Sequence, residues 1–237
     1  IAKARRATAI HPGYGFLAEN PEFVRACEQE DITFIGPPAD VMEIFGDKVA
    51  AKKLAQKVGI PTLPGTDKPV RDEDELVKTA QEIGYPVILK ASFGGGGRGM
   101  RVVRDKSGLI KEYRTAVSEA KKAFGNGDVF VERYLEKPRH VEVQILADQY
   151  GNVVHLYERD CSIQRRHQKI IEFTPSLAID DEQREKICTD AVKLAKAVGY
   201  VNAGTVEFLL DEAGNYYFME MNPRIQVEHT VTEMTTG

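Results

Sequence analysis

The sequence has no apolar run long enough to span a membrane and no signal-peptide pattern at its start. It has no basic excess either: 32 Lys and Arg stand against 36 Asp and Glu, and the net charge of −4 does not indicate a nucleic-acid-binding surface. Its three cysteines (Cys27, Cys161 and Cys188) form no CxxC pair. We therefore expect a cytoplasmic protein in a reducing compartment, or a mitochondrial one in a eukaryote.

The chain also lacks an initiator methionine and a closing element. It starts within a pattern, "IAKARRATAIHPGYGF", and stops at "TEMTTG". Its 237 residues are 42% hydrophobic, enough for a globular protein with a sizeable core. We expect it to be a piece of a larger polypeptide.

The order of the predicted elements indicates an α+β fold. Asn20 is placed to cap a helix that begins at Pro21, and Gly59 to end another that begins near Asp47. Further helices are predicted over 72–84, 107–125 and 180–199, and strands over 32–36, 85–92, 128–135, 139–148, 153–162 and 204–222. Because several strands follow one another through short turns, the middle of the chain should form an antiparallel sheet covered by helices on one side.

The segment "SFGGGGRGMR" has five glycines among residues 94–99. Glycine lets the backbone approach an anion closely, but ordering each one costs roughly 0.5–1 kcal/mol relative to alanine. The segment matches neither a P-loop nor a GxGxxG motif that opens a helix. We interpret it as a lid over phosphates, with a bare hairpin tip as the alternative. Lys90, on the apolar strand before it, would need a partner such as a phosphate.

The segment "GTVEFLLDEAGNYYFMEMN" predicts a hairpin with a metal site. A turn centred between Ala213 and Gly214 pairs Leu209 with Phe218, Glu207 with Glu220, and Thr205 with Asn222. Carboxylates opposite each other lie roughly 5 Å apart at Cβ and repel, unless a cation lies between them. Two acids and an amide suit Mg²⁺ or Mn²⁺, and a mutually solvated pair is the alternative.

The following residues, "PRIQVEH", continue the alternation of polar and apolar positions. If the parity of the strand persists past Pro223, then Arg224, Gln226 and Glu228 extend the same face beyond the metal. A guanidinium there could bind a small anion, and a carboxylate could take a proton from it. The alternative is a solvent-facing strand edge.

The segment "RDCSIQRRHQK" concentrates basic residues next to Cys161: Arg159, Arg165, Arg166, His167 and Lys169. One Cys and one His do not make a zinc site, and an ordinary buried cysteine explains Cys161 better than a nucleophile does. Beside a metal–phosphate site, the basic residues could stabilise developing oxyanions, while a solvated loop is the alternative.

These motifs, with "HPGYGFLAEN", "GDKVAAK", "EKPRHVEVQILAD" and "EMNPRIQVEHTVTE", resemble the biotin carboxylase component of biotin-dependent carboxylases, an ATP-grasp fold, along nearly the whole chain. Pyruvate carboxylases are the most similar members, and acetyl-CoA and propionyl-CoA carboxylases are close to them. The resemblance implies that residues 1–36 are the tail of a Rossmann-like domain and 37–64 a linker. Residues 65–134 would form a mobile lid subdomain, and 135–237 a truncated ATP-grasp core.

The resemblance also implies roles for individual residues. ATP would contact Lys48, Lys90, Gly95, Gly96, Gly97, Glu132, Leu135, His140, Gln164 and His167, and Mg²⁺ or Mn²⁺ would bind Glu207, Glu220 and Asn222. Bicarbonate would bind Arg224, Gln226 and Val227. Glu228 would deprotonate it for attack on the γ-phosphate, and Lys169 would steady the carboxyphosphate.

The implied partners are ATP, bicarbonate, a biotin carrier domain and a carboxyltransferase domain, within a homo-oligomer; no nucleic acid or membrane is expected. The family's arginine that stabilises the biotin enolate would follow residue 237, so we expect nucleotide and metal binding by this piece but weak biotin carboxylation. Two rivals stay open. One is a ligase of the carbamoyl-phosphate synthetase type, and the other is a non-catalytic nucleotide-binding module, which would have no use for Glu228.

Overall fold

The structure, a computed structural model, describes residues 1–91, 99–166 and 168–237. Two compact units make up the chain, and each is described by itself. The first comprises residues 1–62, 138–163 and 169–237, and the second residues 63–137 and 164–168. Among the described helices, none has the length and apolar character needed to cross a membrane. All three cysteines are buried, and no disulfide joins them in the described residues.

The first unit is built on a five-stranded sheet with the order β10-β9-β6-β7-β8. Its strands are β6 (Arg139–Ala147), β7 (Val153–Arg165), β8 (Gln168–Phe173), β9 (Asn202–Leu210) and β10 (Tyr216–Asn222). Strand β6 pairs antiparallel with both β7 and β9, and β9 pairs antiparallel with β10. The predicted antiparallel sheet is confirmed, whereas β8 was not predicted.

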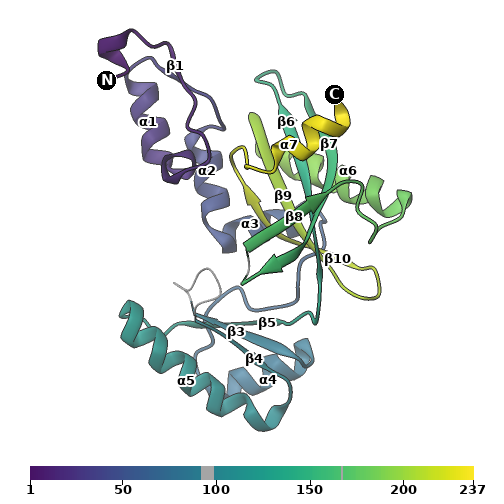
Figure 1. The fold of residues 1–237 in the computed structure, drawn as a ribbon. Coiled ribbons are helices and arrows are strands. Elements are labelled where there is room, and N and C mark those ends of the chain that lie inside the picture. Colours follow the sequence, from purple (N-terminus) through teal and green to yellow (C-terminus); the bar gives the residue numbers. More distant parts are fainter. Residues whose placement is uncertain (92–98, 167) are drawn as a thin grey trace. The chain divides into compact units, whose positions relative to one another are not determined.

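One face of this sheet carries the hydrophobic core. Val141, Val143 and Ile145 of β6 and Val206 and Phe208 of β9 are fully buried there. They pack in one cluster with residues of α6 (Asp181–Ala197), α2 (Ala39–Gly46) and α3 (Lys48–Lys57); α6 runs along the sheet in Figure 1. Burying each such side chain contributes about 1.5–3 kcal/mol. Because strand residues alternate between faces, the intervening polar side chains point to the opposite face.

A bulge in β10 corrects the predicted register of the hairpin. Glu220 pairs with Glu207 and Asn222 with Thr205, as predicted, but Phe218 pairs with Phe208 and not with Leu209. The turn is therefore centred on Ala213 and not between Ala213 and Gly214, and the register shifts between Phe218 and Glu220. The extra residue reverses the parity of the strand. Phe218 thus faces the core, while Glu220 lies on the same face as Glu207.

The start of the chain belongs to the first unit. It contains 3₁₀ turns at Lys3–Arg5 and Phe16–Glu19, the helix α1 (Pro21–Gln29), and β1 (Ala9–Ile10) paired in parallel with β2 (Thr33–Phe34). The predicted cap is confirmed, since Asn20 Oδ1 accepts from the Phe23 backbone N–H at 3.0 Å. Gly59 ends α3 with a φ of +78°, also as predicted. At the other end of α3, Asp47 Oδ1 accepts from the N–H groups of Val49 and Ala50, which fixes Lys48 in the first helical turn.

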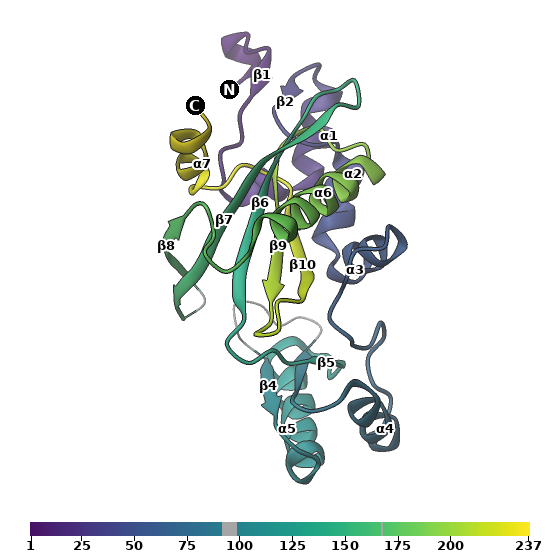
Figure 2. The same ribbon diagram turned by 90° about the vertical axis from the view of Figure 1, so that its right-hand side faces the viewer.

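The second unit is a three-stranded antiparallel sheet packed against two helices. The strand order is β4 (Met100–Val103), β3 (Val87–Ala91), β5 (Val129–Arg133), and the helices are α4 (Glu73–Ile83) and α5 (Lys106–Phe124). Leu76 and Leu109 from the helices are fully buried in one cluster with Leu89 and Val131 from the strands. Figure 2 shows both helices beside this sheet. The unit covers much of the predicted lid, whose boundaries and motion stay a prediction.

Candidate active site

The polar face of the first unit's sheet centres on Glu207, which is buried. Its carboxylate accepts from Asn222 Nδ2 at 2.8 Å and from Gln226 Nε2 at 3.1 Å, and it lies 2.7 Å from His140 Nε2. Burial alone would raise the pKa of Glu207, but the hydrogen bond from His140 and the nearby charges lower it to about 2. The carboxylate is therefore ionised at neutral pH. Its neighbours converge here from β6, β10 and the turn that follows β10.

Lys169, on β8, joins three carboxylates of this face. Its ammonium donates to Glu228 at 2.6 Å, to Glu207 at 3.1 Å and to Glu142. Burial favours the neutral amine, but Glu142 and Glu207 outweigh it and raise the pKa of Lys169 above its usual range. For the Glu228 carboxyl, burial acts to raise the pKa, but the hydrogen bond from Lys169 outweighs it and lowers the pKa. Lys169 and Glu228 are thus held in their charged forms.

The backbone reaches Glu228 by a different route from the one predicted. Strand β10 ends at Asn222, residues 223–228 form bends and a turn, and α7 (His229–Thr236) begins directly after Glu228. The strand parity therefore does not continue past Pro223, and that prediction is wrong. Gln226 and Glu228 are nevertheless buried and reach the polar face through the turn, whereas Val227 is 61% exposed. The Glu228 side chain does not cap α7, so its carboxylate is available to Lys169.

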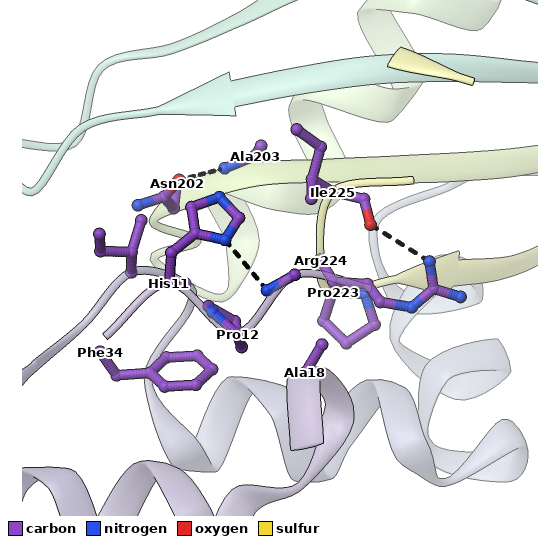
Figure 3. Close-up of a pocket in the computed structure, with 12 residues that line it drawn as sticks. His11, Pro12, Ala18, Phe34, Asn202, Ala203, Pro223, Arg224 and Ile225 are labelled. Atoms are coloured by element: carbon purple, nitrogen blue, oxygen red, sulfur yellow. Dashed lines mark hydrogen bonds between the residues drawn. The ribbon is translucent and has the colours of Figure 1, made fainter. Parts of the chain in front are cut away.

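Arg224 lies beside this turn, next to a small pocket. Its guanidinium donates to Asn222 Oδ1 and to the Ile225 carbonyl, both at 3.2 Å, and Nε lies 3.1 Å from Glu19. The pocket, with about 40 Å³ of open volume, has His11, Phe34, Asn202 and Arg224 in its walls (Figure 3). That volume admits a water molecule or two but no nucleotide.

The predicted metal ligands carry basic partners in this structure. Glu220 is partly exposed, and the Lys48 ammonium lies 3.3 Å from its carboxylate. The nitrogen of the Asn222 amide faces Glu207 and its oxygen faces Arg224. Two facing carboxylates and an amide oxygen form the hard-oxygen set that suits Mg²⁺ or Mn²⁺. A cation entering here would take the places of Lys48 on Glu220 and of nitrogen donors on Glu207.

His140, Glu142 and Glu207 bring their possible ligand atoms within 4.8 Å of one another. The Lys169 ammonium contacts both acids of this group, so a cation is already supplied there by the chain itself. The metal site at Glu207, Glu220 and Asn222 stays a prediction.

The second unit carries other residues of the predicted ATP site. Lys90 on β3 and Glu132 on the neighbouring β5 form an ion pair, so the partner of this strand lysine is a carboxylate of the same sheet. Leu135 and Gln164 also belong to the second unit and are partly exposed. Gly95, Gly96, Gly97 and His167 lie outside the described residues. The ATP-binding roles of all these residues stay predictions.

Arg159 itself cannot supply charge to an oxyanion, whereas that interpretation stays a prediction for the other basic residues of its segment. Arg159 is fully buried, and all its N–H groups are directed to protein acceptors. The neighbouring Cys161 is buried too; burial, together with Glu142, raises the pKa of its thiol, as expected for a structural cysteine and not for a nucleophile. Glu142 itself was missed from the sequence. A signal for it was present: His140, Glu142 and Gln144 stand at every second position of "RHVEVQIL", between apolar residues. The hairpin segment shows the same kind of alternation.

Comparison with protein families gives two matches. The model "Carbamoyl-phosphate synthase L chain, ATP binding domain" matches residues 47–237, and "Biotin carboxylase, N-terminal domain" matches residues 1–42. Pyruvate carboxylase of Bacillus subtilis is 56% identical over 237 residues, which are 100% of this chain and 21% of that protein. The 2-oxoglutarate carboxylase small subunit of Hydrogenobacter thermophilus is 58% identical over 231 residues, 98% of this chain and 49% of that protein. The chain thus spans half or less of the length of these relatives.

Solved structures agree with these matches. Biotin carboxylase from Campylobacter jejuni superposes with a TM-score of 0.89 at 52% identity, covering 98% of this chain and 52% of that one. The biotin carboxylase domain of a thermophilic 2-oxoglutarate carboxylase, bound to bicarbonate, gives a TM-score of 0.92 at 54% identity and covers 98% of this chain and 51% of that one.

Proposed function

Because the chain belongs to the ATP-grasp family of the carbamoyl-phosphate synthase L chain ATP-binding domain, and within it to the biotin carboxylases, we propose that it performs the biotin carboxylase half-reaction. In this reaction ATP phosphorylates bicarbonate to carboxyphosphate, and the carboxyl group is passed to N1′ of biotin on a carrier domain. The observation that carries the proposal is the contact of the Lys169 ammonium with Glu207 and Glu228, next to the turn that bears Arg224 and Gln226.

The turn after β10 would bind bicarbonate. The Arg224 guanidinium and the Gln226 amide supply N–H donors, and the backbone N–H of Val227, an exposed residue, would add another. Glu228 is ionised because Lys169 lowers its pKa, so it can accept the bicarbonate proton once the anion is bound. Lys169 contacts the same carboxylate, and its ammonium would then steady the negative charge of the carboxyphosphate.

Glu207, Glu220 and Asn222 would hold Mg²⁺ or Mn²⁺, which neutralises charge on the phosphates when bound. Lys48, fixed in the first turn of α3, would release Glu220 and contact a phosphate. His140 would approach the ribose. In the second unit, Lys90 would exchange Glu132 for a phosphate, and closure of the glycine segment would exclude water from carboxyphosphate.

The carboxyl acceptor would be pyruvate, because pyruvate carboxylases from bacteria, fungi and mammals are 55–57% identical to this chain. The second candidate is 2-oxoglutarate, which the 58% identical relative from Hydrogenobacter thermophilus supports. The acceptor site would lie in a carboxyltransferase outside this chain. Carboxylation assays of the full polypeptide with each acid distinguish the two.

The test is phosphate release from Mg·ATP by the full polypeptide, with bicarbonate present and then rigorously removed. We expect the rate to rise with bicarbonate and Glu228→Gln to abolish the rise. Glu233→Gln, on the exposed part of α7, is the matched control and should leave it unchanged. A bicarbonate-dependent rate that Glu228→Gln leaves intact would overturn the role of Glu228.

One other function has specific support, since the family model over residues 47–237 is named after a carbamoyl-phosphate synthase. An enzyme of that type also phosphorylates bicarbonate but passes the product to ammonia. Stimulation of ATP turnover by ammonia and not by biotin would favour it.

A further inference from the structure

Arg159, at the centre of β7, has every hydrogen-bond donor directed to a side chain of the polar face. An arginine has five N–H donors. Nε donates to Glu142 at 2.6 Å, Nη1 to Gln144 at 2.8 Å and Thr232 at 2.9 Å, and Nη2 to Gln226 at 3.2 Å and Thr205 at 3.4 Å. Because the side chain is fully buried and its donors are taken, Arg159 has none left for a substrate.

These acceptors come from four separate parts of the first unit. Glu142 and Gln144 lie on β6, Thr205 on β9, Gln226 on the turn after β10, and Thr232 on α7. The hydrogen bond from Arg159 to Thr232 joins β7 to α7, and both elements are labelled in Figure 1. One guanidinium therefore fixes the turn and the helix to the sheet.

The contact with Gln226 sets the orientation of its amide. Its Oε1 accepts from Arg159, so its Nε2 must point the other way, and it donates to Glu207 at 3.1 Å. Gln144 is oriented in the same manner, with Oε1 at Arg159 and Nε2 donating to the Gly204 carbonyl at 3.0 Å. The amide of Gln226 consequently presents N–H groups, and not its carbonyl oxygen, to the side away from Arg159.

Arg159 also shares Glu142 with Lys169. Arg159 donates to Oε1 of this carboxylate and Lys169 to Oε2. Since Glu142 is fully buried, it depends on both cations for compensation of its charge. The position of the Lys169 ammonium, and through it that of Glu228, is thus tied to Arg159.

We propose that Arg159 is a positioning residue for the anion site: it orients the Gln226 amide so that N–H groups face the bound bicarbonate. The inference rests on the proposed function and adds a residue that does not contact substrate. Lysine at this position would keep the charge but offers three donors on a single nitrogen, so it cannot reproduce the five-acceptor arrangement.

The first test is steady-state kinetics of the full polypeptide carrying Arg159→Lys. We expect the KM for bicarbonate to rise about tenfold, the amount that loss of one charge-assisted hydrogen bond produces, while the KM for ATP stays within about twofold. Arg184→Lys is the matched control, because Arg184 also pairs with a buried carboxylate, Glu158, but lies on α6 at the core side. An equal rise in both KM values, or a fall in kcat alone, would show a merely structural role and overturn the proposal.

The second test is a double-mutant cycle with Gln226→Met. If Arg159 acts through Gln226, the double variant should have the bicarbonate KM of Gln226→Met alone, because the amide that Arg159 orients is already gone. Effects that multiply would contradict this route. If Arg159→Lys does not fold, Thr232→Val replaces it, since it removes one acceptor and should raise the bicarbonate KM two- to threefold. No change in that variant would overturn the proposal.

The third test needs no turnover. In the ¹⁵N-labelled 237-residue chain, the Gln226 side-chain NH₂ signal, identified by its loss in Gln226→Met, should shift in Arg159→Lys and not in Arg184→Lys. An unmoved signal would refute the orientation argument. A moved signal in a protein without bicarbonate-dependent turnover would reject the proposed function and leave the positioning role standing.

Discussion

Replacing Glu207 with glutamine should remove a pH-dependent part of the stability of the first unit. The pKa of this carboxyl is lowered from 4.5 to about 2 by His140 and Lys169 against the effect of burial. At about 1.4 kcal/mol per pKa unit, the shift corresponds to roughly 3 kcal/mol of stability. Because the folded-state pKa is the lower one, this stability is present above pH 4.5 and is lost as the pH falls toward 2.

The assay is urea denaturation of the chain and of Glu207→Gln, followed by far-UV circular dichroism at pH values between 7 and 2.5. Glutamine keeps the shape but accepts hydrogen bonds at one oxygen only, so the pH-dependent part of the stability difference reports the charge. We expect the wild type to be more stable by roughly 3 kcal/mol at pH 7 and the difference to shrink steadily below pH 4.5. Unfolding of the second unit is common to both proteins and cancels.

Glu212→Gln is the matched control, because Glu212 lies exposed in the turn of the same hairpin. Its stability difference from the wild type should be small at every pH. The reasoning about Glu207 would be refuted by a difference for Glu207→Gln that stays constant from pH 7 to pH 2.5 or grows as the pH falls.

Three further changes test other parts of the site. Lys169→Met leaves buried carboxylates without their shared cation, so the free energy of unfolding should fall by about 3–5 kcal/mol in a thermal or urea melt. The same variant should lose all bicarbonate-dependent ATP turnover. Lys193→Met, on the exposed side of α6, is the control and should change neither stability nor turnover. Glu220→Gln should weaken Mn²⁺ affinity in the presence of ATP at least tenfold by electron paramagnetic resonance while stability stays within about 0.5 kcal/mol, and unchanged affinity would remove Glu220 from the metal site. Deletion of Met219 removes the extra residue of the bulge, so Phe218 should still face the core and Glu220 the polar face opposite Glu207, and the variant should fold and bind Mn²⁺ together with ATP; an unfolded variant would contradict the account of the bulge.

The sequence sufficed for those parts of the site that depend on local pattern. Pairing of Glu207 with Glu220 follows from a turn signal and strand alternation, and Asn20 and Gly59 end their helices by backbone chemistry alone. The bulge escaped prediction because the turn was centred half a residue too late, which changes each pairing partner by one residue; this error and the missing bulge cancelled at the two acids.

The remaining features depend on contacts between distant segments. Arg159 and Lys169 lie ten residues apart in a basic run and look alike in sequence, yet one has all its donors occupied and the other lies at the centre of the acids. Their difference arises from strand direction and from the acceptors on β9 and α7. The sequence predicted a phosphate as the partner of Lys90. Its partner in the structure, Glu132, was not foreseen because β5 lies about forty residues further along the chain.

In the acidic pair of the hairpin, each carboxylate already has a basic neighbour: Lys48 for Glu220, and Lys169 with His140 for Glu207. If a divalent ion binds at the predicted metal site, it would therefore exchange counterions and would not add charge to an empty site. A bare metal ion would displace the Lys48 ammonium from Glu220 without offering it another anion. A metal–nucleotide complex brings phosphates with which the ammonium can pair. We expect the site to discriminate against free metal for this reason, and the nucleotide and the metal to enter together.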